Sequence, residues 1–146
     1  NYGAKKNDRI IEIRKKVIKY GIIIMTFGFL FIIFFSEPLL RFFTNDLDVI
    51  KFGVDYLRIA AFITWAYPLI FLNISVLQGL KKPMFALWIG LFRQIIAPII
   101  VFSFVIFKFG FGIKGLYWSI FGIVWLSALI TFDYTNRVLK KLSISV

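Results

Sequence analysis

Four long stretches of this chain contain no charged residue. They cover residues 20–36, 59–80, 94–107 and 115–132. A helix needs about 20 mostly apolar residues to cross the hydrocarbon core of a bilayer. In addition, 60% of the residues are hydrophobic and 20% are aromatic, whereas soluble domains average roughly 45–50% apolar residues. The sequence therefore predicts a multi-pass membrane protein with four spans.

The four spans are predicted to be helices. We place them at about 17–36, 56–80, 84–107 and 113–133. In hydrocarbon, each backbone polar group needs a partner within its own helix or within a closed barrel. These runs lack the short alternation of barrel strands. We therefore expect an all-α membrane bundle in which residues 1–146 form a single membrane domain, with an amphipathic segment at 1–16 and a basic tail at 134–146.

The net charge of +11 is distributed unevenly across the membrane. The segments that four spans place on one side carry eleven cations: Lys5, Lys6, Arg9, Arg14, Lys15, Lys16, Lys81, Lys82, Arg137, Lys140 and Lys141. The loops on the other side hold Arg41, Lys51, Lys108 and Lys114. The positive-inside rule therefore predicts that both ends of the segment are cytoplasmic. Because these cations follow the membrane topology, we expect lipid rather than nucleic acid as their partner.

Amphipathic segments precede the first two spans. In residues 7–19, Ile10, Ile13 and Val17 share one side, so the cations would lie against anionic headgroups or in water. Asn45 is the predicted N-cap of a second helix. Its apolar residues recur at helical spacing: Leu47, Ile50, Val54 and Leu57. We expect this short helix to lie on the outer surface before the second span begins.

The sequence LQGLKKP, residues 77–83, predicts a tight turn between the second and third spans. Gly79 suits a left-handed helix cap, and Pro83 suits the first residue of the next helix. The two lysines keep the turn in water. Gly110 and Gly112 are predicted to form the corresponding turn before the last span.

Polar residues within the second span are the first candidates for function. At about 100° per residue, one face contains Thr64, Tyr67, Phe71, Ser75 and Gln78. Such a face could line an aqueous cavity for amphipathic substrates, or it could form hydrogen bonds between helices. Asn73 points the opposite way, which favours helix packing for that residue.

Arg93 lies at membrane depth in the third span. Ala86, Gly90 and Ala97 share its face, and small residues permit close helix packing. We therefore expect Arg93 to face protein, where it could meet a carboxylate, a carbonyl or an anionic headgroup and so belong to the substrate cavity. The alternative is that it extends to the nearby membrane surface.

Several other residues are predicted to shape the helices. Pro68 and Pro98 lie in mid-span and should kink their helices. In the fourth span, Gly115, Ser119 and Gly122 form a stripe of small residues that suits helix packing.

The sequence lacks the residues and motifs that several functions require. The chain has no cysteine and no histidine, so no disulfide or thiolate metal site can form. No aspartate or glutamate lies between Tyr56 and Phe132. Nothing resembles a nucleophile with its base, a phosphate-binding loop or a metal cluster. We therefore expect neither an enzyme nor a metal or cofactor site.

The order of several short motifs resembles a known family. NYGAKK precedes the first span, FFTNDLDVIKFGVDYLRI the second, and SVLQGLKKP closes it. RQIIAP lies in the third span and GIKGLYWSI opens the last. Together they resemble the C-terminal third of a multidrug and toxic compound extrusion (MATE) transporter. The resemblance implies a longer protein of twelve helices in two six-helix lobes, with these spans as helices nine to twelve and Gly3 and Ala4 in the preceding loop.

The resemblance also implies a function. Such transporters export small organic, often cationic or amphipathic compounds in exchange for sodium ions or protons, by alternating access between two lobes. The face from Thr64 to Gln78 would then line the central cavity. Because the last three spans contain no carboxylate except Asp133 at the inner boundary, the coupling ion would bind outside this segment. The remaining helices of the transporter would be its partners, and the abundance of Ile, Phe and Lys favours the inner (plasma) membrane of a prokaryote.

Two alternatives remain at this point. A lipid-linked oligosaccharide flippase of the same superfamily would use cations such as Arg93 to hold a pyrophosphate. A non-transporting, truncated membrane bundle would only assemble with other helices. The single arginine at membrane depth argues mildly against the flippase.

Overall fold

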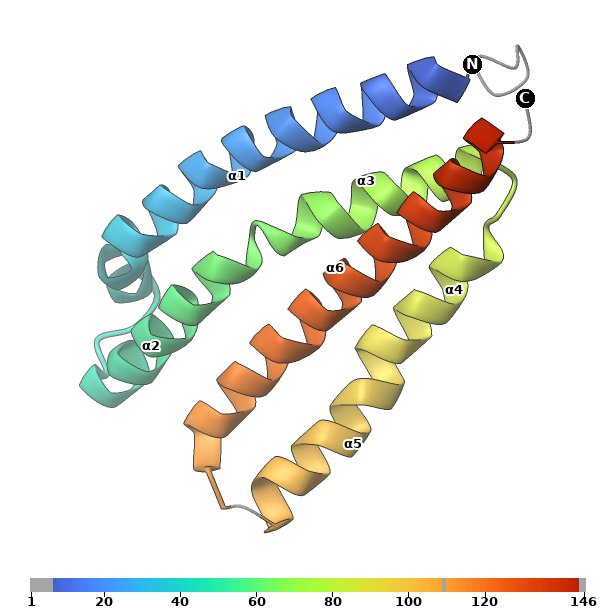
Figure 1. The fold of residues 1–146 in the computed structure, drawn as a ribbon. Helices are drawn as coiled ribbons and strands as arrows, with labels where there is room; N and C mark the ends of the chain where they lie inside the picture. Colours follow the sequence, from blue (N-terminus) through green and yellow to red (C-terminus); the bar gives the residue numbers. More distant parts are fainter. Residues whose placement is uncertain (1–6, 109, 145–146) are drawn as a thin grey trace.

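A computed structural model describes residues 7–108 and 110–144, and these residues form an all-helical bundle without strands (Figure 1). The α-helices are α1 (Asn7–Phe43), α2 (Leu47–Ile63), α3 (Ala66–Gly79), α4 (Met84–Leu91), α5 (Ala97–Ser103) and α6 (Gly112–Ile144). Two π-helical turns, η1 (Phe92–Ile96) and η2 (Phe104–Lys108), flank α5. The predicted roles of Gly3, Ala4, Lys5 and Lys6 lie outside the described residues.

Helix α1 joins the predicted amphipathic segment and the first span into one helix. It contains 37 residues, which corresponds to about 55 Å at 1.5 Å per residue. The hydrocarbon core of a bilayer is about 30 Å thick, so α1 extends beyond it. The helix continues through Pro38 to Phe43, so the predicted span, 17–36, is only part of α1.

Helix α2 corrects two predictions. The N-cap is Asp46 rather than Asn45, because the Asp46 side chain accepts hydrogen bonds from the amides of Asp48 at 2.9 Å and Val49 at 3.2 Å. The predicted surface helix is also not separate from the second span. Helix α2 continues to Ile63, because its buried residues, including Ile50, Val54 and Ala61, keep the helical spacing.

The second span is bent where α2 ends and α3 begins. The two helices meet at 43° across a two-residue break at Thr64 and Trp65. Pro68 has no N–H to donate to the carbonyl of Thr64, four residues earlier. Taken together as one bent span, α2 and α3 join the three other helices long and apolar enough to cross a membrane: Asp8–Phe43, Met84–Lys108 and Gly112–Leu142.

The turn between α3 and α4 differs in detail from its prediction. Gly79 is the last residue of α3, and the left-handed residue is Lys81, with φ of 60°. Pro83 is the N-cap of α4 rather than its first residue. The turn before α6 is confirmed, since Gly110 and Gly112 have φ of 61° and 60°. Helix α6 also continues past the predicted span to Ile144.

The core lies between α3 and α6. One cluster of buried residues contains Ile63, Ala66, Ile70, Val124 and Ala128, and a second contains Leu77, Leu80, Val138 and Leu139. Figure 1 shows α6 between α3 and the α4–α5 arm, and α1 begins at the same end of the bundle where α6 ends. This arrangement matches an even number of membrane crossings.

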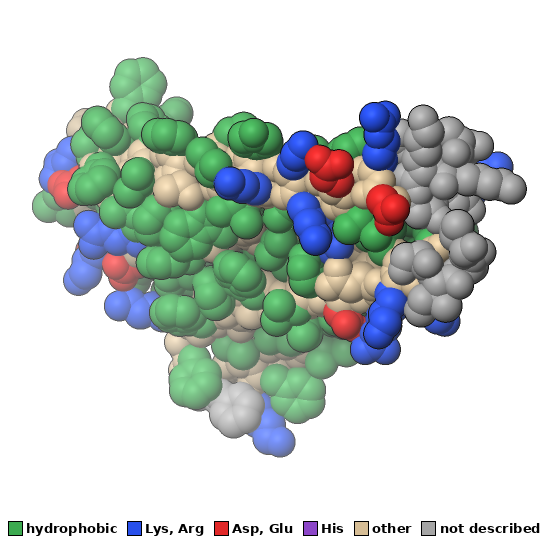
Figure 2. Space-filling view, turned by 45° about the horizontal axis from the view of Figure 1, so that its top comes forward, with side chains coloured by type: hydrophobic (Ala, Val, Ile, Leu, Met, Phe, Trp, Pro, Cys, Tyr) green, Lys and Arg blue, Asp and Glu red, His purple; other side chains and the backbone are tan. Residues whose placement is uncertain are grey.

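The outer surface is rich in large apolar side chains. Figure 2 shows a face covered mainly by hydrophobic groups, with most of its charged side chains toward the margins. Phe27 is 70% exposed, Phe34 is 73% exposed and Ile99 is 64% exposed. Contiguous apolar patches of this kind mark membrane or protein contacts. Together with the membrane-spanning helices, they make the chain a multi-pass membrane protein.

Candidate functional site

The predicted face of the second span lies along the outside of α3. Tyr67 is 36% exposed and Phe71 is 51% exposed, while Ser75 and Gln78 are also exposed. Thr64, at the bend, is partly buried. Asn73, which the sequence places on the opposite side, is fully buried. The two faces of α3 therefore have very different environments within the described chain.

Two hydroxyls of this face are held by their own helix. Thr64 Oγ1 donates to the carbonyl of Ala61 at 2.7 Å, and Ser75 Oγ donates to the carbonyl of Phe71 at 2.9 Å. Both hydroxyl oxygens retain lone pairs that can accept a hydrogen bond. A ligand at this face would thus meet two acceptors and the aromatic rings of Tyr67 and Phe71.

Arg93 extends this face from the third span. It lies in η1, and its guanidinium carbon is 5.6 Å from the centroid of the Phe71 ring. The rings of Phe71 and Tyr67 are stacked, with centroids 5.8 Å apart and planes 18° apart. Arg93 forms no ion pair with a described residue. The structure thus brings Arg93, Phe71 and Tyr67 into one row, and the aromatic partner of Arg93 was not among those predicted.

The small residues near Arg93 have mixed environments. Ala97 is buried, whereas Ala86, Gly90 and Pro98 are only partly buried. A Cβ added at Gly90 would meet no atom within 4 Å. Close packing by described residues therefore occurs at Ala97 but not at Gly90.

The small residues of α6 differ in the same way. A Cβ at Gly115 would lie 2.5 Å from Phe111 Cβ and 2.7 Å from Val105 Cγ1, so only glycine permits this approach of η2 to α6. Ser119 is buried and donates to the carbonyl of Gly115 at 2.7 Å. Gly122 is exposed, with nothing within 4 Å of its added Cβ.

A buried charge that the sequence analysis assigned to the surface lies where α1, α3 and α6 meet. Arg14 is only 7% exposed, so the expectation that it faces headgroups or water was wrong. Its Nε donates to Asn73 Oδ1 at 2.6 Å and its Nη1 donates to Asn136 Oδ1 at 2.7 Å. Its guanidinium carbon also lies 4.7 Å from the centroid of the Phe132 ring.

The sequence did contain a signal for this buried charge. Arg14 lies four residues after Ile10 and three before Val17, on the apolar side of the predicted amphipathic helix. A charged residue in that position must be paired or hydrogen-bonded if the side is buried. Asn73, on the inward side of the second span, supplies one such partner. We refer below to Arg14, Asn73 and Asn136 as the arginine junction.

Four of the seven carboxylates form ion pairs. Glu12 pairs with Lys16 at 2.7 Å, Glu37 with Arg41 at 2.8 Å, and Asp133 with Arg137 at 2.8 Å. At the opposite end of the bundle from the arginine junction, Asp55 of α2 pairs with Lys114 of α6 at 3.3 Å. Within residues 7–108 and 110–144, no group of three or more histidine, cysteine, aspartate or glutamate residues could hold a metal ion.

Comparison with known families identifies the kind of protein. The MatE family model matches residues 1–105. The chain belongs to the MatE family. No curated protein and no solved structure matches this MatE chain. Members of the family are membrane efflux transporters rather than enzymes, which agrees with the apolar surface and the membrane-spanning helices described above.

Proposed function

We propose that this MatE chain is part of a secondary antiporter that exports organic, often cationic or amphipathic compounds in exchange for sodium ions or protons. The observation that carries the proposal is the exposed face of α3. It combines the rings of Tyr67 and Phe71 with the polar groups of Ser75 and Gln78, and the partly buried Thr64 lies at the bend before it. Ligand sites of this kind combine apolar walls with a few polar groups that fix orientation.

The other parts of the proposal concern coupling and topology. Helix α1 contains three carboxylates that could lie near the membrane surface: Asp8, Glu12 and Glu37. All three are exposed, and Glu12 and Glu37 form ion pairs. We therefore assign the coupling ion to helices outside this segment. Both ends of the segment would be cytoplasmic in the inner membrane of a prokaryote, because the larger share of cations lies at those ends.

Cysteine accessibility in the whole transporter tests the assignment of the face. The segment has no native cysteine, so single cysteines can be placed at Tyr67, Ser75 and Gln78. A charged, membrane-impermeant thiol reagent should label all three positions, because each would line a water-filled cavity. A cysteine at Asn73 controls for burial, and one at Ile99, which is 64% exposed, controls for exposure to lipid. Labelling at Ile99 equal to that at Ser75 would overturn the assignment.

Transport itself requires a reconstituted assay. Full-length protein in liposomes should move a cationic dye when a sodium or proton gradient is imposed, and dissipating the gradient with an ionophore should stop the movement. If neither gradient drives the dye while the cysteine labelling is as expected, the cavity assignment stands and the antiport proposal fails.

A further inference from the structure

Arg93 is the only charged residue between Lys82 and Lys108. It lies nine residues after Met84, where α4 begins. This corresponds to about 14 Å at 1.5 Å per residue, which is roughly the middle of a hydrocarbon core about 30 Å thick. A charged residue at that depth is costly unless it faces protein or a water-filled cavity, and it often marks a substrate path.

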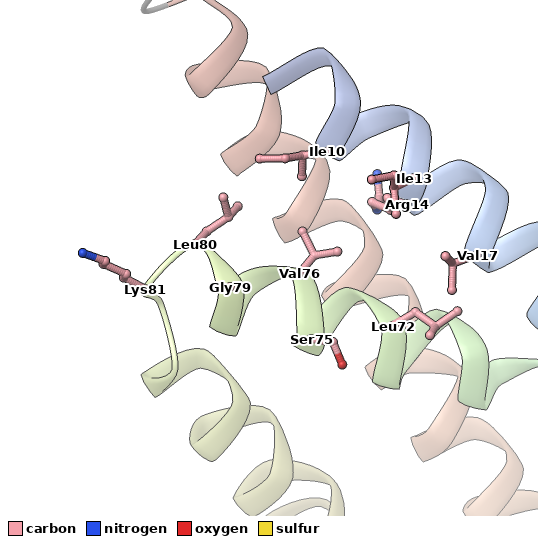
Figure 3. Close-up of a pocket in the computed structure, with 10 residues that line it drawn as sticks. All are labelled: Ile10, Ile13, Arg14, Val17, Leu72, Ser75, Val76, Gly79, Leu80 and Lys81. Atoms are coloured by element: carbon pink, nitrogen blue, oxygen red, sulfur yellow. The ribbon is translucent and has the colours of Figure 1, made fainter. Parts of the chain in front are cut away.

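The guanidinium group of Arg93 does not extend along its helix to the membrane surface. Its carbon lies 5.6 Å from the centroid of the Phe71 ring, and Phe71 lies eight residues, or about 12 Å, before the end of α3 at Gly79. In a view of the cavity between α1 and α3, Figure 3 shows Ser75 directed away from α1 and Val76 directed toward it. The face of α3 that contains Phe71 and Ser75 is therefore turned away from α1.

The hydrogen-bond donors of Arg93 are accessible and unused within the described part of the chain. A guanidinium group has five N–H donors in one plane. Among residues 7–108 and 110–144, none accepts a hydrogen bond from Arg93 or forms an ion pair with it. In the same residues, buried side-chain nitrogens without a partner occur only at Arg14 and Trp125. The donors of Arg93 are therefore open to a ligand, whereas Nη2 of Arg14 is enclosed.

The charge of Arg93 also lacks a counter-ion at its own depth in this segment. The acidic residues of the chain are at positions 8, 12, 37, 46, 48, 55 and 133, so none lies in the charge-free runs at 59–80, 94–107 and 115–132. Opposite charges attract each other more strongly in surroundings of low dielectric constant than in water. The site formed by Arg93 and the row of rings next to it therefore favours a ligand with a negative group.

We propose that Arg93 selects substrates that carry a carboxylate group next to an aromatic ring. The carboxylate accepts two parallel hydrogen bonds from the edge of the guanidinium group, and the ring of the substrate packs along the exposed ring of Tyr67. This inference rests on the proposed function, because helices outside this segment would complete the cavity. A purely cationic compound would be repelled by Arg93, and a neutral amide of the same shape would lack the charge attraction.

Ligand binding to the full-length transporter in a neutral detergent tests this inference without requiring transport. The probes are 2-naphthoate, the neutral 2-naphthamide and the cation 2-naphthylmethylammonium, which share one ring system and differ in charge. The dissociation constant of each radiolabelled probe is measured by equilibrium dialysis. We expect naphthoate to bind about tenfold more tightly than naphthamide, because hydrogen bonds between two charged groups are stronger than those to a neutral amide. The cation should bind most weakly.

Three variants locate the preference. Arg93→Gln should bind naphthoate and naphthamide about equally and should bind the cation more tightly than the wild type does. Arg93→Lys keeps the charge but not the planar pair of donors, so it should retain part of the preference. Arg9→Gln is the matched control, because Arg9 is exposed near the beginning of α1, and it should keep the full preference. The melting temperature of each variant without ligand checks that it is folded.

The inference is overturned if the wild type does not prefer naphthoate, if the preference persists in Arg93→Gln, or if Arg9→Gln loses it to the same extent. A lower melting temperature of Arg93→Gln with an unchanged preference would also overturn it and would assign Arg93 to a carboxylate on another helix of the transporter. The proposed function fails separately, when no gradient moves the dye in liposomes although naphthoate binding depends on Arg93. Dye transport without any such dependence defeats this inference alone.

Discussion

Arg14 and Arg93 approach α3 from two different helices, yet their surroundings are opposite. Arg14 is buried, and two amide oxygens fix its guanidinium group. Arg93 is partly exposed and lies over the ring of Phe71 without an ion pair to any described residue. Hydrogen bonds to charged groups contribute more than a cation–π contact at an exposed site. Arg14 therefore holds helices together, whereas the partly exposed Arg93 is available to a ligand.

The largest expected effect comes from replacing Arg14. Arg14→Ala removes two charge-assisted hydrogen bonds and leaves Oδ1 of the fully buried Asn73 without a donor, although Asn73 Nδ2 still donates to the Leu69 carbonyl. The free energy of unfolding should fall by about 3 kcal/mol, measured by denaturant titration in detergent micelles. Arg93→Ala is the control, and an equal loss in both variants would break the distinction between the two arginines.

Asn73 should show a smaller loss that depends on Arg14. Asn73→Ala leaves Arg14 Nε without an acceptor and should cost about 2 kcal/mol. In a double-mutant cycle, Arg14→Ala and Asn73→Ala should be coupled by about 1–2 kcal/mol, because the residues share one hydrogen bond. The control is Asn136→Ala, which should cost less because Asn136 is exposed. Additive losses for the first pair would argue against the arginine junction as a unit.

Replacing Arg93 should change ligand binding more than stability. Arg93→Gln should alter the free energy of unfolding by less than about 0.5 kcal/mol. It also frees the face of the Phe71 ring, so the KM for a cationic dye should fall about fivefold in a liposome transport assay. Adding Phe71→Ala to the Arg93→Gln variant should abolish this fall in KM. An unchanged KM in Arg93→Gln would remove Arg93 and Phe71 from the substrate face.

The smallest effect is expected at the Lys114–Asp55 pair, which sharpens the contrast with Arg14. Lys114 is 68% exposed and Asp55 is 35% exposed. Exposed pairs contribute about 0–1 kcal/mol and are screened by salt. Lys114→Gln should therefore change the unfolding midpoint slightly at low salt and hardly at all at high salt. A loss as large as that of Arg14→Ala would mean that the pair is shielded from water.

The helical fold was predictable because each charge-free run must satisfy its backbone internally in lipid. Details at the ends of helices were less predictable. Asp46 and Asn45 are both good caps, and the choice depends on which side chain reaches the free amides. Helix α2 continues past the predicted boundary between the surface helix and the second span. This continuation depends on burial of Ile50 and Val54 against neighbouring helices, which the periodicity of the sequence alone does not reveal.

The candidate site was partly predictable from the sequence, because helical geometry determines which residues share a face. The opposite directions of Asn73 and of the face containing Phe71 followed from helical geometry. Helical spacing also places Arg14 on the apolar side of its helix, but its partners did not follow from the sequence, because they lie 59 and 122 residues away in the chain. Contacts between Arg93 and Phe71 likewise depend on how the third span packs against α3. Such long-range pairings are properties of the tertiary structure.

The π-helical turns beside α5 affect how the third span should be compared with other helices. A π-turn closes its hydrogen bond one residue later than an α-turn, as the bond from the Ala97 amide to the Phe92 carbonyl does. One extra residue rotates everything after it by roughly 100° relative to a regular helix. Positions before and after η1 therefore follow two separate helical wheels, and removing one residue within η1 would restore a single regular wheel while leaving the α5 side chains on the face that they now occupy.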